Sequence, residues 1–431
     1  MTGGEDEILD DVRGWLAGQP SITDALAETL AIPSLPATLE QNRVIDVVEQ
    51  IVGASDRSTR DRWVPDWDAV RAMRSPVDDQ ELWAQLQERD PRYEEVLPQL
   101  QVSVHRLSGG EGRTLELNGH VDVVPADGQP WSGPAFAPRV VDGRMLARGA
   151  MDMKAGLVAT AYAYRYLTER WSGDGTVLFA IVPEEETGGD GTLATLHRGY
   201  VPDGAVFAEP TDLGVVHRHV GIQGFDITAT GREGGMLKSS WGRSVAPTLS
   251  RIGAALADLE EARTRWAFES GGYVDDDLPG FINYTIHAGD WPATRAGTGT
   301  IRGLMGIIPG ETQEEAAEAL RVAVRAVAVD AGVEIEVAVW PGGHRGGELE
   351  SGHGLVSAFA LAETGAGSPT RAGTMVCDAK IMQGGGWAPS IVLGPIGGGL
   401  HAADEWVDLD SVSTLVGLLV CGSMRYLGGN P

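Results

Sequence analysis

The chain has 431 residues, of which 42% are hydrophobic, and its 33 Lys and Arg against 61 Asp and Glu give a formal net charge of −28. That charge repels phosphate backbones and anionic lipid, which argues against nucleic-acid binding and against attachment to a membrane surface. Two cysteines, the absence of a long apolar run and an acidic first segment argue against a disulfide framework, a spanning helix and a secretory signal, so we expect a soluble cytoplasmic protein.

The first hundred residues contain two kinds of pattern. Residues 1–60 predict helices, with a possible cap at Ser21 and helical apolar spacing over 42–53. Residues 62–100 mix Trp, Pro and charge, which is typical of an irregular and partly helical segment. The sequence assigns this segment no role.

From about residue 101 the pattern becomes strand, loop and helix in alternation. Apolar runs end at Leu117, Val182, Ala208 and Leu393, and a helix is expected over 153–170. Such alternation predicts an α/β domain with a mainly parallel sheet and helices on both faces.

Residues 221–340 interrupt this alternation. We expect a strand, a helix, two strands, a helix and a strand over 222–230, 245–264, 279–288, 299–307, 312–330 and 333–340. This β-α-β-β-α-β order is the split βαβ arrangement of ferredoxin-like domains. The predicted division is a catalytic domain over 1–220 and 341–431, with an inserted domain over 221–340.

Most of the apolar runs are followed by residues that bind metals or transfer protons. His120 and Asp122 follow the first run, Glu184–Glu186 the second and Glu209 the third, while His401 comes after a glycine-rich turn. Asp152 opens the helix that starts near 153. Because ligands bind outside the carboxyl ends of the strands in open α/β sheets, these side chains are expected to gather at one site.

Simpler interpretations exist for each motif. A lone His-x-Asp is common, although Asp122 can reach the His120 ring because residues two apart in a strand point the same way. An acidic triplet is usually a solvated face. Glu184–Glu186, however, follow a run expected to be buried, where several carboxylates are costly unless a cation compensates them.

The types of ligand favour a metal site of a particular kind. Histidine and carboxylate without thiolate suit Zn²⁺, Mn²⁺ or Co²⁺. Two histidines and three carboxylates are too many for one tetrahedral ion, but they suffice for two ions about 3.5–4 Å apart that share one bridging carboxylate.

These motifs resemble the dinuclear zinc amidohydrolase family of aminoacylases, acetylornithine deacetylase, succinyl-diaminopimelate desuccinylase and glutamate carboxypeptidase. The resemblance covers nearly the whole chain and keeps the order of the motifs. It rests on Leu30–Ser34, Gly119–Pro125, Gly149–Gly156, Glu184–Gly191, Ala208–Thr211 and His401–Glu405.

The resemblance implies a role for each residue of the predicted site. One metal ion would be bound by His120 and Glu209, the other by Glu186 and His401, and both by Asp152. Asp122 would hold His120, and Glu185 would be the general base. It would take a proton from a metal-bridging water that attacks an amide carbonyl, and later deliver it to the leaving amine. The resemblance also implies two divalent ions, first Zn²⁺ with Co²⁺ or Mn²⁺ as alternatives, and a homodimer formed through the inserted lid domain.

The sequence departs from the family at its lid histidine, which reaches across the dimer to the oxyanion. Aligned from Gly231 without gaps, this position is Gly235. Either another donor substitutes for the histidine, or the chemistry has changed. Loss of one oxyanion donor costs roughly 10²–10³ in rate, which a slower hydrolase could tolerate. Lys380 stands where the family often has Arg, and Arg302 is a candidate anchor for a substrate carboxylate.

The sequence therefore predicts a metal-dependent amidohydrolase, deacylase- or carboxypeptidase-like, that cleaves a small N-acyl amino acid or dipeptide-like substrate. The alternative is a non-hydrolytic enzyme that uses the same metals for condensation, lyase or isomerase chemistry, which Gly235 motivates. A catalytically inactive binding protein is disfavoured, because every predicted ligand and the base are present.

Overall fold

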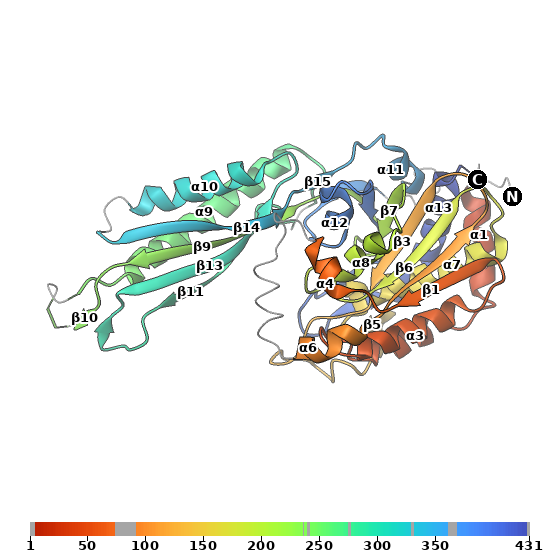
Figure 1. The fold of residues 1–431 in the computed structure, drawn as a ribbon, viewed down its shortest axis with the longest axis horizontal. Coiled ribbons are helices and arrows are strands. Elements are labelled where there is room, and N and C mark those ends of the chain that lie inside the picture. Colours follow the sequence, from red (N-terminus) through yellow and green to blue (C-terminus); the bar gives the residue numbers. More distant parts are fainter. Residues whose placement is uncertain are drawn as a thin grey trace.

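The computed structural model describes residues 5–73, 92–235, 237–238, 242–274, 277–328, 332–360 and 369–428. Figure 1 shows two lobes side by side, one built on a large sheet with both chain ends close together, the other formed by the insert. Among the described residues, no helix is both long enough and apolar enough to cross a bilayer.

The N-terminal region is largely helical, as predicted. Helices α1, α2 and α3 span Glu5–Leu16, Ile22–Leu30 and Glu40–Val52. Ser21 caps α2, because its hydroxyl accepts a hydrogen bond from the amide of Asp24 at 3.3 Å.

The prediction of helix up to residue 60 is wrong at its end. Strand β1 (Ser58–Trp63) begins there and pairs antiparallel with β2 (Val102–Ser108). Pairing at the sheet edge decides the structure of this polar segment, which has no apolar alternation of its own. The partly helical segment expected over 62–100 contains α4 (Trp67–Ala72), α6 (Arg92–Val96) and the 3₁₀ turn Leu97–Gln99, while 74–91 lie outside the described residues.

The large sheet has the strand order β1-β2-β6-β3-β7-β17-β8-β15, with β16 paired to β8. Its central strands β6 (Thr176–Val182), β3 (Thr114–His120), β7 (Gly204–Phe207) and β17 (Ser390–Val392) run parallel. The outer strands β8, β15 and β16 span Val215–His219, Gly347–Glu348 and Thr370–Gly373.

Helices cover both faces of this sheet. Along β6, alternate residues such as Phe179 pack with α3, α7 (Ala155–Arg170) and α13 (Leu409–Tyr426). The residues between them, such as Leu178, pack with α8 (Asp190–Arg198) and α12 (Ala379–Gly384). The apolar run of β6 is continuous because both of its faces are buried. The predicted fold class is thus confirmed.

Segments that connect strands of the large sheet form a second, smaller antiparallel sheet. Its order is β18-β19-β5-β4, with bounds Gly397–Gly398, Trp406–Asp408, Arg144–Leu146 and Arg139–Val141. This sheet joins the segment that leads to Asp152 with the loop that carries His401, which the sequence did not predict.

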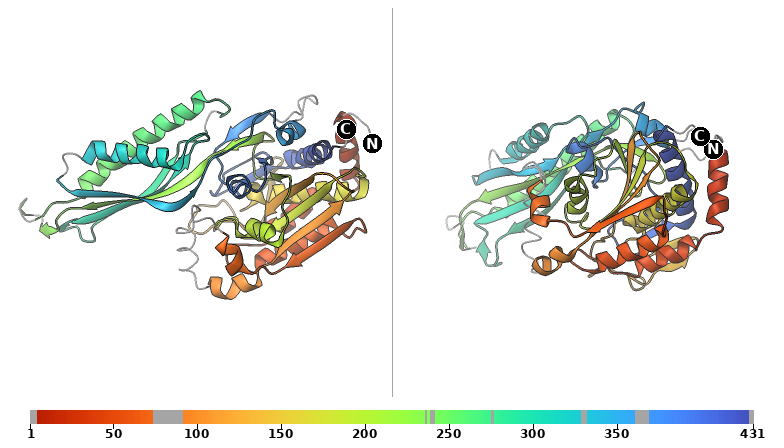
Figure 2. Two further views of the ribbon diagram at one scale, coloured as in Figure 1. Left: turned by 45° about the horizontal axis from the view of Figure 1, so that its top comes forward. Right: turned by 45° about the vertical axis from the view of Figure 1, so that its right-hand side comes forward.

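The insert has the predicted β-α-β-β-α-β order. Its main elements are β9 (Gly221–Thr230), α9 (Ala246–Glu269), β11 (Ile282–Ala288), β13 (Thr298–Ile307), α10 (Gln313–Ala328) and β14 (Glu334–His344). The antiparallel order β11-β13-β9-β14 is that of a ferredoxin-like sheet, and Figure 2 shows α9 and α10 on one face of it. A separate two-stranded antiparallel sheet pairs β10 (Gly234–Gly235) with β12 (Thr294–Arg295). The boundaries at 220/221 and 340/341 stay a prediction.

Candidate active site

Three adjacent parallel strands deliver acidic and histidine side chains to one edge of the large sheet. His120 is the last residue of β3, Glu184–Glu186 follow β6, and Glu209 lies two residues after β7. Because β6, β3 and β7 are neighbours and run parallel, their carboxyl ends lie at the same edge. The strand order therefore brings together groups that are distant in the sequence.

Asp152 lies at the centre of this group. It sits in the turn Ala150–Lys154, between β5 and α7. Its Oδ1 lies 3.0 Å from Nε2 of His120, and its Oδ2 lies 3.2 Å from Nε2 of His401. The two oxygens of one carboxylate thus face two different imidazoles.

Each imidazole also faces a second carboxylate. Glu209 Oε1 lies 3.5 Å from Nε2 of His120, and Glu186 Oε2 lies 3.4 Å from Nε2 of His401. The other oxygen of Glu186 is buried without a hydrogen-bond partner among the described residues. The arrangement is a pair of His–carboxylate sets that share Asp152.

The charges of this cluster perturb one another strongly. Burial raises the pKa of Glu209 well above its usual value, and the charge of Asp152 raises it further. The same two causes raise the pKa of Glu186 to about 6. Burial acts to lower the pKa of His120, but the charge of Glu209 and hydrogen bonds outweigh it and raise the pKa. Hydrogen bonds to Asp152 and Glu186 raise the pKa of His401 to about 10.

This donor set fits divalent cations. One ligand atom each from His120, Asp152 and Glu186 lie within 4.8 Å of one another. The orphaned oxygen of Glu186 is a buried acceptor without a donor among the described residues, and the raised pKa values of Glu186 and Glu209 reflect the cost of burying carboxylates close to one another. A divalent ion would compensate this buried negative charge.

Asp122 contacts His120 and also the turn formed by Glu185 and Glu186. Its backbone oxygen lies 2.9 Å from Nδ1 of His120, whereas its carboxylate is 3.6 Å from that atom. The carboxylate instead accepts hydrogen bonds from the amides of Glu185 and Glu186, at 3.2 and 3.0 Å. Asp122 therefore fixes the His120 ring through its carbonyl and the Glu185–Glu186 turn through its side chain.

The pKa of Glu185 responds to several charges at this site, among them that of Lys380. Burial raises the pKa of Glu185 well above its usual value, the charge of Asp378 raises it further, and the positive charge of Lys380 acts in the opposite direction. Lys380 lies in α12 and is only 4% exposed. A carboxyl with raised proton affinity beside a buried ammonium suits a group that accepts a proton and later releases it.

Glu184 has a different environment from the two glutamates that follow it. It is fully buried, and its oxygens accept hydrogen bonds from the Ala37 amide, Gln41, Tyr93 and Thr187. Its φ of +62° turns the chain sharply at the end of β6. Glu184 thus anchors the turn, whereas Glu186 faces His401 and the charges of the cluster act on Glu185.

Arg302 and Gly235 lie in the insert. Arg302 forms a bidentate ion pair with Asp226 at 2.7 and 2.9 Å, and its guanidinium lies over the ring of Trp340. Gly235 pairs with Thr294, and its strand β10 lies at the end of the insert that points away from the catalytic lobe (Figures 1 and 2). The structure does not bring these two residues to the cluster within one chain.

Two residues at the site were not predicted from the sequence. Arg148 and Glu405 are 1% and 0% exposed and form an ion pair of 2.6 Å, beneath the turn that carries Asp152. Glu405 ends the His401–Glu405 motif and Arg148 directly precedes the Gly149–Gly156 motif, but charged residues between predicted strands are usually interpreted as solvated loop residues. Only their burial reveals the contact.

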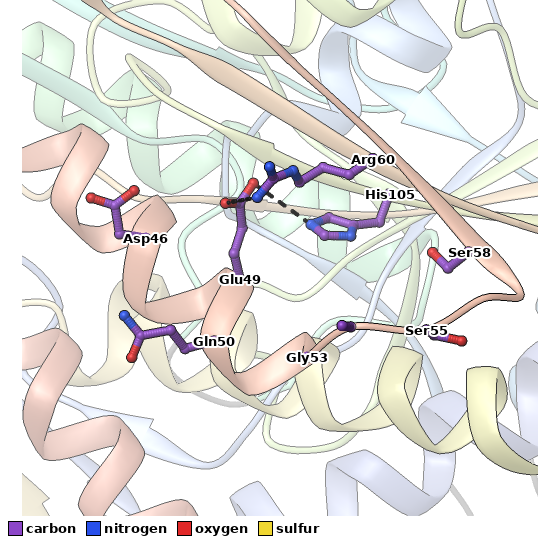
Figure 3. A pocket seen from close by; sticks show the side chains of 9 residues that line it. Asp46, Glu49, Gln50, Gly53, Ser55, Ser58, Arg60 and His105 are labelled. Carbon is purple, nitrogen blue, oxygen red and sulfur yellow. Dashed lines mark hydrogen bonds and ion pairs between the residues drawn. The ribbon is translucent and has the colours of Figure 1, made fainter.

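A cavity of about 750 Å³ lies elsewhere on the catalytic lobe, between α3, β1 and β2. Figure 3 shows Glu49 at its wall, with Arg60 and His105 turned toward its carboxylate. None of the residues predicted for the site lines this cavity.

The sequence of this chain is similar to those of known proteins. A model of peptidase family M20/M25/M40 matches residues 117–421. A probable succinyl-diaminopimelate desuccinylase from Staphylococcus aureus (strain MRSA252) is 34% identical over 142 residues, which are 31% of this chain and 35% of that relative. The succinyl-diaminopimelate desuccinylase of Granulibacter bethesdensis is 28% identical over 345 residues, 75% of this chain and 85% of the relative.

The fold is also similar to that of a solved structure. The solved structure of a tripeptidase from Staphylococcus aureus Mu50 matches with a TM-score of 0.68 at 17% identity, covering 94% of this chain and 98% of that one. The family model confirms the resemblance predicted from the motifs and supports a hydrolytic enzyme. The match to the first relative spans only about a third of its length, so its activity is not carried over by that match alone.

Proposed function

Because the chain belongs to peptidase family M20/M25/M40, we propose that it hydrolyses the amide bond of a small N-acyl amino acid or dipeptide-like substrate with two divalent metal ions. The observation that carries this proposal is the position of Asp152. Its two oxygens face His120 at 3.0 Å and His401 at 3.2 Å, as a bridging ligand requires. The name of the Granulibacter relative supports an N-acylated amino acid as the substrate class.

We propose the following ligand sets. His120 and Glu209 hold one ion, Glu186 and His401 hold the other, and Asp152 is shared. Zn²⁺ is the first candidate, with Co²⁺ or Mn²⁺ as alternatives, because the donors are imidazole and carboxylate. When bound, such ions lower the pKa of a water and polarise a substrate carbonyl.

The chain's own residues then move the proton. Glu185 accepts a proton from the attacking water on its carboxylate and donates it to the leaving amine. Its raised pKa supports this cycle, because burial and Asp378 strengthen its hold on the proton. Asp122 keeps both partners in place, through its carbonyl on His120 and its carboxylate on the Glu185 amide.

Lys380 and Arg302 are the proposed contacts for a substrate carboxylate. Lys380 is buried close enough to Glu185 for its charge to lower that group's pKa. Arg302 is engaged by Asp226, so a substrate carboxylate would have to compete with this ion pair. Lys380→Met should therefore raise KM more than Arg302→Met does.

The test measures amine release from a panel of N-acyl amino acids, including N-succinyl compounds, and of di- and tripeptides, with Zn²⁺, Co²⁺ or Mn²⁺ supplied. We expect turnover of at least one member by the wild type. Glu185→Gln should keep the bound ions and lose turnover, whereas Glu261→Gln, an exposed residue of the insert, should change neither. Retained turnover in Glu185→Gln would refute the assignment of the base.

A second candidate function rests on Gly235. If the scaffold catalyses a non-hydrolytic condensation, lyase or isomerase step, restoring a histidine there would bring no gain in amide hydrolysis. Gly235→His should raise amidase activity in a weakened hydrolase. Gly234→His, one residue earlier in β10, is the matched control, because neighbouring strand residues point to opposite faces.

We also propose that the protein is a cytoplasmic homodimer that associates through residues 221–340. Strand β10 lies at the outer end of the insert, so a group at position 235 would act on a second copy of the chain. Light scattering on the full chain tests the dimer, and a monomer at all concentrations would refute it.

A further inference from the structure

A single buried carboxylate holds the turn that carries Asp152. Oε1 of Glu405 accepts hydrogen bonds from the amides of Met151 and Asp152, at 2.8 and 3.1 Å. Oε2 accepts from the amide of Gly149 at 3.0 Å and from Nη1 of Arg148 at 2.6 Å. Both oxygens are saturated, so the backbone at Asp152 has little freedom to shift.

The same arginine reaches the second histidine of the site through a glutamine. Nη2 of Arg148 donates to Oε1 of Gln129 at 2.8 Å, and Nε2 of Gln129 donates to the backbone oxygen of His401 at 2.8 Å. His401 has a φ of +56° and a side chain that is 49% exposed. Because His401 is half exposed, packing alone does not fix its position, and the hydrogen bond from Gln129 restrains its backbone.

Stability alone does not explain this series of contacts from Glu405 through Arg148 to Gln129. Arg148 and Glu405 are each 1% exposed at their side chains, and a buried ion pair often stabilises a fold no better than apolar residues of the same size. The β5–β19 pairing already joins these two segments through their backbones. We infer that the ion pair between Arg148 and Glu405 additionally fixes the orientation of the Asp152 backbone on one side and of Gln129 on the other.

We propose that Glu405, Arg148 and Gln129 form a positioning relay for the metal centre. Glu405 sets Asp152, which both ions would share, and Gln129 sets His401, which one ion would use. This inference rests on the proposed function, because it requires two divalent ions at the cluster. It assigns no contact with substrate to any member of the relay.

The relay predicts different losses of metal affinity for its two ends. Apoprotein is titrated with Co²⁺ by calorimetry and by its visible absorption, and bound metal is counted after gel filtration. Glu405→Gln places an amide N–H₂ against backbone donors and should weaken binding of both ions by about 10–100-fold. Gln129→Met keeps the length of the side chain and should weaken one ion only, so that the count falls from two toward one.

The insert contains a matched control. Arg263 and Glu311 form another buried ion pair, with Nη1–Oε1 at 2.6 Å and side chains 6% and 9% exposed. Glu311→Gln removes a pair of the same type away from the cluster and should leave the affinity for both ions unchanged. Thermal unfolding of each apoprotein shows whether the variants are folded.

The outcomes separate the relay from the function on which it rests. A wild type that binds two ions, with equal binding by Glu405→Gln and Gln129→Met, would overturn the relay and leave the proposed function intact. A wild type that binds no divalent ion would overturn both. Loss of ions in Glu311→Gln as large as in Glu405→Gln would assign the effect to general destabilisation and would also overturn the relay.

Discussion

Tyr93→Phe is the sharpest test of how the turn before the proposed base is held. The hydroxyl of Tyr93 donates to Oε2 of Glu184 at 3.0 Å, and Tyr93 is 8% exposed while Glu184 is fully buried. Glu184 directly precedes Glu185. The change removes one hydroxyl, keeps the ring, and leaves a buried carboxylate with one donor fewer.

The structure sets the size of the effect. Hydrogen bonds to charged groups contribute about 1.5–3 kcal/mol, and the loss is largest where water cannot replace the donor. Burial raises the pKa of Glu184, and the charge of Asp122 raises it further, so this carboxylate already lacks solvation. We expect the free energy of unfolding of Tyr93→Phe to fall by about 2 kcal/mol, and turnover to fall with it.

The chain offers a matched control in Tyr200. Its hydroxyl donates to Oδ2 of Asp61 at 2.9 Å, but the carboxylate is 31% exposed and also pairs with Arg198. Water can replace the lost hydroxyl there, so Tyr200→Phe should cost less than about 0.5 kcal/mol. Urea denaturation of both variants measures the difference, and hydrogen exchange over 92–99 reports whether α6 loosens.

Equal stability losses in the two variants would refute this reasoning. So would a loss in Tyr93→Phe without faster exchange in α6, because the bond would then not hold the segment that carries Tyr93. These measurements therefore test whether the hydrogen bond from Tyr93 to Glu184 links the irregular segment after β1 to the turn that precedes Glu185.

Three further predictions concern other parts of the structure. Burial alone would raise the pKa of Glu49, but its hydrogen bonds and two guanidinium groups lower this pKa to about 2. The ionised Glu49 therefore stabilises the folded protein fully above the unfolded pKa near 4.5, and this stabilisation is lost as the pH falls toward 2. The difference in unfolding free energy between wild type and Glu49→Gln, from urea curves, should therefore shrink by about 1 kcal/mol between pH 5 and pH 3, after discounting for solvent. Gly156→Ala would place a methyl 1.8 Å from the carbonyl oxygen of Ala208 and should cost about 3 kcal/mol or more in thermal unfolding, whereas Gly354→Ala meets open space and should be near neutral. Removal of divalent ions with EDTA should lower the melting temperature, and Zn²⁺ should restore it, because ions at 100 times their Kd add about 2.7 kcal/mol to the folded state.

The part of the site on the large sheet could be predicted from the sequence. Buried parallel strands are continuous apolar runs, and the residues after each run lie at the ligand-binding edge, so the local pattern predicts His120, the triplet Glu184–Glu186 and Glu209 as candidates. The pattern does not say which glutamate of the triplet points inward. The positive φ of Glu184 and its partners from α3 decide that, and both depend on tertiary structure.

The second part of the site was less visible in the sequence. Asp152 and His401 stand on loops of the small antiparallel sheet, whose strands of two or three residues give no periodic signal. The hydrogen bonds from Glu405 and Gln129 that hold these loops join residues 253 to 272 positions apart in the chain, as with Glu405 and the Asp152 amide. Neither short strands nor such contacts can be found by propensity or spacing.

The two parts of the site are therefore supported by different structures, and this has a consequence for the metal centre. His120 and Glu209 stand at the ends of β3 and β7, inside a sheet whose two faces are both packed. His401 depends on a half-exposed loop that Gln129 ties down. If both ions bind, the ion between Glu186 and His401 should be the first to leave when chelator is added, because local opening of that loop costs less than breaking the central sheet. Stepwise release, with the first ion lost faster in Gln129→Met, would follow from this difference; simultaneous release of both ions would show that the shared carboxylate of Asp152, rather than the supporting loops, controls the stability of the centre.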